Sequence, residues 1–512
     1  MTPEQLAATL ALIGLVIVAA SLLSGVVERT GLPQVAIFLA LGALLGPAGL
    51  GLLDFTLESP ALAIIATLAL LLVLFSDAVT IDMAEVREQR RLAWLVIGPG
   101  TLLSATLIAV AGWALLGLSP AAAAILGASL ASTDPVLLRS LLRRRDLPGT
   151  ARVALRLESG MNDAVLLPIV AISMLALRPG AAPAREEVGR RVLELFVLGP
   201  GLGALVGWLA IVALDWVRAR LPVRRDYESI YALGVAFTAY AAAEGVGGSG
   251  FLAGFAAGLV IASLDVELCD CFLDFGEASA EMFLLLTFVA FGTSLIWRGL
   301  TIIDARTLGF AVVALGVRTA VLLPLLARTG IDRGSRRLIA WVGPRGLSSL
   351  LLVLLPLFAG IPGAESLFTI TALVVLISVV AHGGGIALFL RHPVPAPTAE
   401  VPTAEVPAPA AAAPAPAAAL ATALSAEPVT AAAGANGGAP VSADPERITI
   451  DEYQRLVAHG EPVIVVDART DRTYRLDDVT ARGAVRLPPD DAPRRARELG
   501  LANHATLVVY CA

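Results

Sequence analysis

Apolar residues dominate the first three quarters of the chain, in long runs separated by short polar breaks. Each run is close to 20 residues, about the length at which an α-helix crosses the ~30 Å hydrocarbon core of a bilayer. The pattern predicts an all-α polytopic membrane domain over residues 1–391. We expect about 13 spans, at approximately 7–27, 33–53, 61–80, 93–118, 121–142, 150–178, 191–217, 228–247, 249–264, 280–299, 304–328, 335–360 and 366–390.

The pattern changes twice after the last span. Proline and alanine fill residues 392–446, a composition that buries no core and predicts a disordered linker. A helix-like stretch at 451–460 then precedes two short apolar runs, 462–467 and 506–510, that predict β-strands. The chain is therefore expected to end in a small α/β segment at 447–512.

Composition and charge place the protein in a membrane. Hydrophobic residues make up 57% of the chain and charged residues 16%, against about 25% charged in soluble domains. Arginines at the predicted loops on one side outnumber those on the other three to one. The positive-inside rule then predicts an N-terminus outside the cell membrane and a C-terminus in the cytoplasm. The first apolar run lacks a basic flank and is long, so we expect a retained helix, not a signal peptide.

The sixth predicted span carries a polar cluster, Glu158-Ser159-Gly160-Met161-Asn162-Asp163. An ionised carboxylate near a helix centre costs about 2.5–3.5 kcal/mol, so its presence needs a reason. Ser159 and Asp163 are four residues apart and share a helix face, with Glu158 and Asn162 on a neighbouring stripe. Oxygen ligands of this kind suit a hard cation. The alternative interpretation is a polar cluster that only holds helices together.

Two other spans are interrupted by proline and glycine. The fifth contains Ser132-Thr133-Asp134-Pro135, and the twelfth contains Gly343-Pro344-Arg345-Gly346. If spans 1–6 and 8–13 are inverted repeats, these breaks occupy matching positions, which indicates a transport site at the membrane midplane. Arg345 needs an anionic partner at that depth, and Glu158 is the best candidate. A simple proline kink and a snorkelling arginine are the alternatives.

The third predicted span ends in a further acid, Asp77. Its place near the end of the apolar run leaves two interpretations open, a member of the ion site or an interfacial carboxylate.

These motifs resemble those of the monovalent cation:proton antiporters, on the electroneutral sodium/proton exchanger branch. The resemblance covers residues 1–391 and rests on Thr133-Asp134-Pro135, on ESGMND from Glu158, on GSGFLAGFAAGL from Gly248 and on GPRG from Gly343. It implies a homodimer in the inner membrane, with a core domain that moves against a dimerisation domain.

The resemblance also implies a role for each polar residue. Asp163 would bind the cation and the proton alternately, beside Asn162, where electrogenic relatives have a second Asp. Ser159, Thr133 and Asp77 would complete the shell of the transported Na⁺, although the third-span acid is often Glu in this branch. Asp134 would balance the crossed helix ends, and Glu158 and Arg345 would form a structural ion pair.

The function expected from these features is secondary transport, not enzymatic catalysis. Monovalent cations, protons and the bilayer are the expected partners, with no cofactor and no nucleic acid. Because one carboxylate would titrate, we expect one-for-one exchange that moves no net charge. Potassium is an alternative to sodium or lithium, since the ligand type does not separate these ions.

Residues 447–512 resemble a rhodanese-like domain, through VIVVDAR, GAVRLPPD and LVVYC with Cys511 at a strand end. In that family the cysteine opens a loop whose N–H groups hold a persulfide or an anion. Only Ala512 follows Cys511, so we expect a partial domain without sulfurtransferase activity. The alternative of another class is a membrane sensor regulated through this cytoplasmic module.

Overall fold

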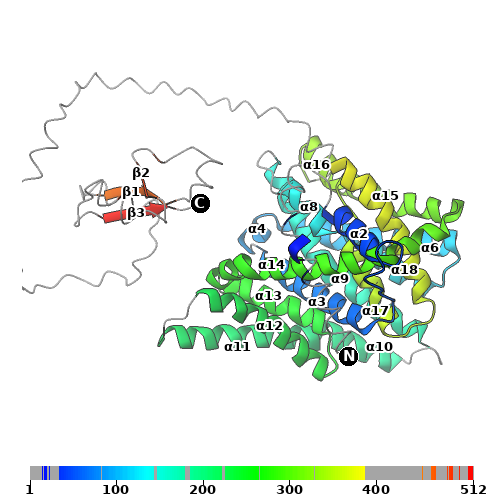
Figure 1. The fold of residues 1–512 in the computed structure, drawn as a ribbon, viewed down its shortest axis with the longest axis horizontal. Helices are drawn as coiled ribbons and strands as arrows, with labels where there is room; N and C mark the ends of the chain where they lie inside the picture. The colour runs from blue at the N-terminus through cyan, green and yellow to red at the C-terminus, as the bar shows by residue number, and fades with distance from the viewer. Residues whose placement is uncertain are drawn as a thin grey trace, which may run out of the picture. The chain divides into compact units, whose positions relative to one another are not determined.

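The protein divides into two compact units, Met1–Val401 and Pro402–Ala512, which are described separately (Figure 1). The computed structural model describes residues 14, 17–19, 22, 34–81, 83–142, 147–178, 185–221, 225–264, 266–327, 329–386, 453, 463–468, 481, 484–487, 495 and 506–510. The predicted linker, Cys511 and all but five residues of the first predicted span lie outside these residues.

The first unit is built of helices. Their bounds are α2 Gln34–Leu45, α3 Pro60–Val79, α4 Met83–Glu88, α5 Arg90–Leu95, η1 Val96–Gly100, α6 Thr101–Leu116, α7 Pro120–Ala131, α8 Pro135–Leu142, α9 Gly149–Leu177, α10 Arg185–Leu193, η2 Glu194–Leu198, α11 Gly199–Arg218, α12 Arg225–Gly245, α13 Gly250–Leu264, α14 Val266–Ala290, η3 Phe291–Leu295, η4 Ile296–Ile302, α15 Ala305–Leu326, α16 Arg333–Trp341, α17 Leu347–Phe358, α18 Ala364–Ser378 and η5 Val379–Gly383.

Eight helices in the described part of the chain are long and apolar enough to cross a membrane. They coincide with the predicted third to seventh, tenth, eleventh and thirteenth spans. Three shorter apolar helices, α2, α13 and α17, fall on the second, ninth and twelfth, and α12 falls on the eighth. The uncertain connection between the eighth and ninth spans is a turn at Gly247, whose φ of 82° favours glycine. The prediction of an all-α polytopic membrane domain is confirmed.

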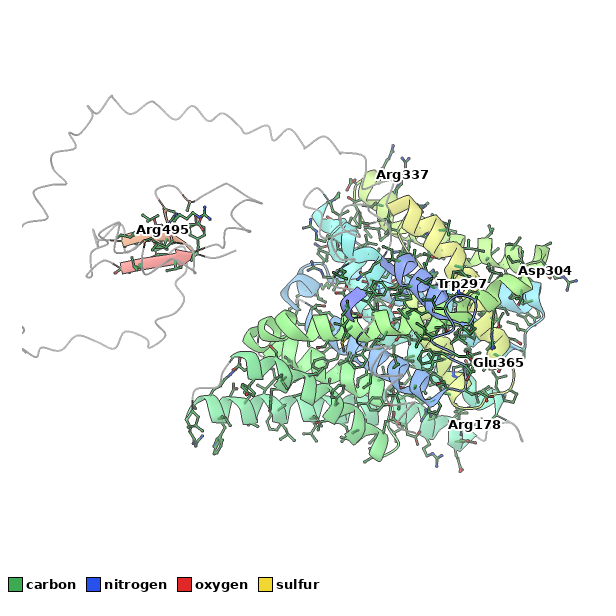
Figure 2. All side chains as sticks on the ribbon, viewed as in Figure 1. Arg178, Trp297, Asp304, Arg337, Glu365 and Arg495 are labelled. Atoms are coloured by element: carbon green, nitrogen blue, oxygen red, sulfur yellow. The ribbon has the colours of Figure 1, made fainter. Side chains whose placement is uncertain are left out.

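Local sequence signals fix where several of these helices begin. Proline is the first residue of α3, α7 and α8. Proline is favoured at this position because it has no N–H, and the first N–H of a helix has no acceptor within the helix. Asp304 opens α15 at the edge of the unit (Figure 2) with a capping box, in which it accepts from the Thr307 N–H at 2.7 Å. The backbone N–H and the hydroxyl of Thr307 hold the pKa of Asp304 below its ordinary value, so the cap stays ionised at neutral pH.

Small residues let the helices approach closely. α11, α12, α13 and α14 lie side by side (Figure 1), and α13 and α14 both pack against α3. A Cβ atom at Gly203 of α11 would overlap the backbone of Ala253 in α13. The contact between α11 and α13 therefore requires glycine at this position, as at other close helix crossings in membranes.

The second unit contains a small parallel sheet with strand order β2-β1-β3. β1 (Val463–Asp467) pairs in register with β3 (Thr506–Tyr510), and β2 (Val485–Arg486) lies on its other edge. The two strands predicted from the sequence thus both form. Parallel strands need a crossover connection of a dozen or more residues, and the sequence between β1 and β3 is long enough to provide one.

The close contact between α11 and α13 leads to a stability prediction. Gly203→Ala forces the two backbones apart, which costs about 1–3 kcal/mol. We expect the melting temperature of the detergent-purified protein to fall by several degrees, as followed by intrinsic tryptophan fluorescence.

Gly201→Ala is the matched control, because Gly201 lies two residues away in the same helix with open space around its Cβ position. Its melting temperature should equal that of wild type. Equal melting temperatures for both variants would show that the backbones are not in contact at Gly203.

Candidate functional site

The two interrupted helices meet at their breaks. One is formed by α7 and α8 with residues 132–134 between them, and the other by α16 and α17 with residues 342–346 between them. The Asp134 N–H donates to the Pro344 carbonyl at 2.9 Å. Both breaks leave backbone groups without helical partners, and these groups are buried in protein, as irregular backbone at membrane depth must be.

Asp134 accepts hydrogen bonds from the N-terminal ends of α8 and α17, which are the second halves of the two interrupted helices. Its Oδ1 takes the Val136 N–H of α8 at 2.9 Å, and its Oδ2 takes the Leu347 N–H of α17 at 3.0 Å. A carboxylate at two helix N-termini is also favoured by both helix dipoles. A Cβ atom at Gly346 would overlap this carboxyl group, so the approach of α17 to Asp134 requires glycine there.

Two arginines donate to carbonyls at the C-terminal ends of α7 and α16, which are the first halves of the two interrupted helices. Arg345 donates from Nη1 to the Ala131 and Ser132 carbonyls at 2.8 and 2.9 Å, at the end of α7. Arg318 of α15 donates from Nη1 to the carbonyls of residues 339 and 340 at 2.5 and 2.9 Å, near the end of α16. Each guanidinium therefore satisfies carbonyls that the breaks leave free.

The prediction that Glu158 forms an ion pair with Arg345 is wrong, because the partner of Glu158 is another arginine. Glu158 is paired with Arg318, through Arg318 Nε and Glu158 Oε1 at 2.7 Å and a second contact between Nη2 and Oε2. This two-point geometry is the one in which arginine binds carboxylates most strongly. A Cβ atom at Gly343 would overlap the Arg318 side chain, so glycine makes room for the pair. Arg345 instead uses the helix-end carbonyls.

Arg318 was not a predicted site residue, although the sequence around it indicates a buried charge. It is the one charged residue in 310–326, and an arginine inside an apolar run of that length calls for a partner. Its partner lies 160 residues earlier in the chain, a distance over which sequence spacing carries no information.

Asp163 lies on α9, buried, where the two breaks converge. The Ser132 hydroxyl donates to its Oδ1 at 2.5 Å, and the Ser348 side chain at the start of α17 interacts with the same carboxyl group. Its Oδ2 accepts no hydrogen bond from the described residues. Neither serine was a predicted site residue, although Ser132 adjoins the predicted Thr133.

The structure brings the other predicted residues to this point with different contacts. The Asn162 amide donates to the Thr133 hydroxyl at 2.7 Å, while its buried Oδ1 has no donor among the described residues. Ser159 donates to the Arg156 carbonyl at 3.2 Å in its own helix. Asp77 lies against α9 at Gly160, where a Cβ would be 3.9 Å from the Asp77 carboxyl carbon. Gly160 is three residues before Asp163 and on the same helix face.

The chemistry of these groups fits a proton or a small hard cation. Asp163 Oδ2 and Asn162 Oδ1 are buried acceptors whose lack of a donor is costly, and the hydroxyls of Ser132 and Thr133 adjoin them. A cation bound by oxygens, or a proton on the carboxyl group, would satisfy them.

Comparison with known proteins shows the family to which the chain belongs. Residues 15–392 match the family model described as "Sodium/hydrogen exchanger, transmembrane". The K(+)/H(+) antiporter NhaP2 of Shewanella sp. strain ANA-3 is 30% identical over 391 residues, which are 74% of this chain and 66% of the relative. The chain thus spans just under two thirds of that relative's length.

Two further proteins are more distant. The Na(+)/H(+) antiporter NhaG of Bacillus atrophaeus is 26% identical over 62% of each chain. The solved structure of the sodium proton antiporter MjNhaP1 from Methanocaldococcus jannaschii has a TM-score of 0.60 at 18% identity, over 75% of this chain and 98% of that one, which shows a likeness of fold. The family match covers well over half of the sequence, and the chain belongs to the transmembrane sodium/hydrogen exchanger family, whose members are transporters and not enzymes.

Proposed function

We propose that the protein exchanges a monovalent cation for protons across a membrane, with both competing for Asp163. The observation that carries this proposal is a buried carboxyl group at the meeting point of two interrupted helices, with Oδ1 bonded to Ser132 and Oδ2 without a hydrogen bond to the described residues. Such a group can be loaded with a cation or with a proton, and both loaded states are neutral. Alternating access would then carry either one across, while the empty ionised state is penalised by its charge.

The neighbouring residues receive roles from their contacts. Thr133, Asn162 and Ser159 would supply neutral oxygens to the cation, and Asp77 would act from the adjacent helix α3. Asp134 would hold the two second half-helices in place. Glu158 and Arg318 would tie α9 to α15, and Arg345 would neutralise the end of α7.

The same residues support a one-for-one exchange. The residue next to Asp163 is Asn162, an amide that does not titrate. Asp163 would therefore be the one acid of the site that binds one proton or one monovalent cation. Each half of the cycle then moves one positive charge and the two cancel, which removes the ~2.3 kcal/mol per charge per 100 mV that a membrane potential imposes.

Sodium, or lithium, is the cation we favour, and potassium is the second candidate. Relatives carry both names, K(+)/H(+) antiporter NhaP2 and Na(+)/H(+) antiporter NhaG. The predicted oxygen ligands serve either ion, so a direct comparison of cations is part of the test below.

The remaining features of the organisation are also proposals. We infer a homodimer in the cell's inner membrane, N-terminus outside, with a membrane domain at 1–391, a linker at 392–446 and a partial rhodanese-like segment at 447–512. Transport that survives deletion of 393–512 would separate this proposal from a sensor regulated through the segment.

The role of Asp163 can be tested in everted membrane vesicles loaded with a pH-sensitive dye. Sodium or lithium pulses should move protons in wild type, and Asp163→Asn should abolish the response, because the amide neither carries the proton nor neutralises the cation. Potassium pulses on the same vesicles decide between the two candidate ions.

Asp215→Asn is the control, since this acid is 62% exposed at the end of α11. It should leave the flux unchanged. Silence of wild type toward every cation, or an active Asp163→Asn variant, would refute the proposed exchange.

Electroneutrality gives a second prediction. In sealed proteoliposomes with a sodium gradient, an imposed potential of either sign should leave the initial rate of proton movement unchanged. A rate that follows the potential, or a current under voltage clamp, would rule out one-for-one exchange while leaving antiport itself intact.

The corrected ion pair gives a third prediction. Removing one partner of a buried pair costs about 3–5 kcal/mol, because the other charge is left without its counter-ion. Glu158→Gln and Arg318→Gln should each lower the melting temperature markedly, and the double variant should lose much less than the sum of the two.

Glu158→Gln combined with Arg345→Gln provides the matched comparison. Since Arg345 bonds to carbonyls, these two losses should be closer to additive. A larger coupling for Glu158 with Arg345 than with Arg318 would restore the pairing first expected from the sequence.

A further inference from the structure

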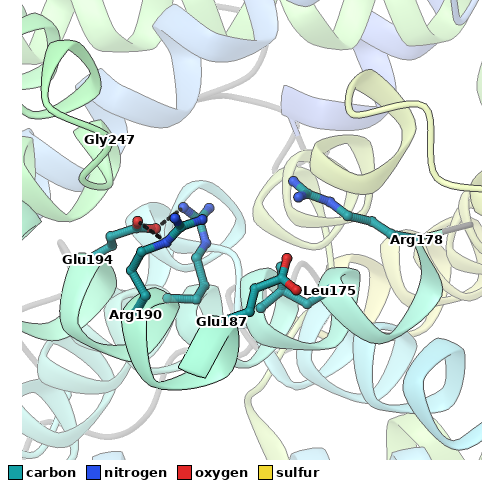
Figure 3. A pocket seen from close by; sticks show the side chains of 7 residues that line it. Leu175, Arg178, Glu187, Arg190, Glu194 and Gly247 are labelled. Atoms are coloured by element: carbon teal, nitrogen blue, oxygen red, sulfur yellow. Dashed lines mark hydrogen bonds and ion pairs between the residues drawn. The ribbon is translucent and has the colours of Figure 1, made fainter. Parts of the chain in front are cut away.

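The end of α9 faces α10 and the turn at Gly247 across a hollow of about 240 Å³ (Figure 3). Its lining is rich in charge and mixed in sign, with the arginines 178, 190 and 191 and the glutamates 187 and 194. It lies well away along α9 from Asp163, and the proposed transport cycle makes no use of it.

The charges around this hollow are satisfied unevenly. Glu194 is bracketed by Arg190 at 3.3 Å and Arg191 at 3.1 Å. Arg178 and Glu187 make no ion pair within the described part of the chain, and both side chains point into the hollow (Figure 3). Among the described residues, the hollow therefore presents one cation and one anion that take part in no ion pair.

The hollow also lies where charged sequence gives way to apolar sequence. Arg178 directly follows the last residue of the membrane helix α9, and Glu194 is the last acid before the apolar helix α11. Leu193, Phe196 and Val197 beside it are 57–59% exposed. A charged pocket next to exposed apolar side chains is the arrangement that a phospholipid meets at the surface of a membrane, with its headgroup in the pocket and its chains beside it.

We propose that this hollow binds the headgroup of a zwitterionic phospholipid that carries a primary ammonium group, that is, a phosphatidylethanolamine. Its phosphate would bind Arg178, whose guanidinium matches phosphate oxygens in two-point geometry. Its ammonium would donate to Glu187.

Charge complementarity separates this lipid from the other common headgroups. A phosphatidylglycerol would satisfy Arg178 through its phosphate, but its neutral glycerol group carries no positive charge to pair with the Glu187 carboxylate. A phosphatidylcholine has the right charges but no N–H donor for the Glu187 carboxylate. A phosphatidylethanolamine meets both residues, and by doing so it would join the end of α9, the helix of Asp163, to α10.

Native mass spectrometry of the full-length protein in detergent tests the assignment, with each lipid added at increasing concentration. Wild type should retain phosphatidylethanolamine about tenfold more tightly than the other two, since a hydrogen bond between charged groups is worth that factor or more. Glu187→Gln should remove the preference over phosphatidylcholine, and Arg178→Gln should weaken every phospholipid adduct.

Matched controls lie close by on the chain. Glu186→Gln alters an exposed acid next to Glu187 that does not line the hollow, and Arg298→Gln alters an exposed arginine elsewhere. Both should bind as wild type does. A preference for phosphatidylglycerol, the absence of any selective adduct, or adducts equally strong in Arg178→Gln and Glu187→Gln would overturn the proposal, and none of these results depends on whether the protein transports ions.

Discussion

An interrupted helix inside a membrane exposes N–H and C=O groups that lipid has no means to satisfy. In this protein one carboxylate satisfies N–H groups at two such interruptions, because Asp134 accepts hydrogen bonds from the Val136 N–H of α8 and the Leu347 N–H of α17. Arg345 and Arg318 donate to the carbonyls at the C-terminal ends of α7 and α16, respectively. The breaks are therefore held in one geometry, and that geometry brings Ser132 and Thr133 to Asp163 and Asn162.

The buried charges around the crossing fall into two groups. Asp134 and Glu158 are negative, Arg318 and Arg345 are positive, and all four are bonded to each other or to helix ends. Their sum is zero, so this part of the interior keeps its charge balance whatever the site holds. Asp163 stands outside this set and is held by hydroxyl groups alone among its described contacts. A positive charge taken up from outside the protein is what would balance it.

Much of this arrangement could be predicted from local sequence, and the rest depends on packing. Hydropathy located the spans, and proline with glycine located both breaks, because each of these signals lies within a few residues. The polar cluster of the sixth span placed Asp163 and Asn162 on neighbouring stripes of one helix. The partner of Glu158 was mistaken because α15 is brought to α9 by tertiary packing, and Arg345 was the more conspicuous arginine. Ser132 and Ser348 were missed since serine is common in membrane helices and only the fold aims their hydroxyls at Asp163.

The absence of a side chain at Gly346 lets segments 213 residues apart share one carboxylate, and this bears on the order in which the chain can mature. Helices α7, α8 and α9 are synthesised long before α17. Until α17 arrives, Asp134 lacks the Leu347 N–H as a donor, and the α7 carbonyls lack Arg345. The first half would therefore enter the bilayer with its break unfinished, needing water or another protein beside it until residues 343–347 follow.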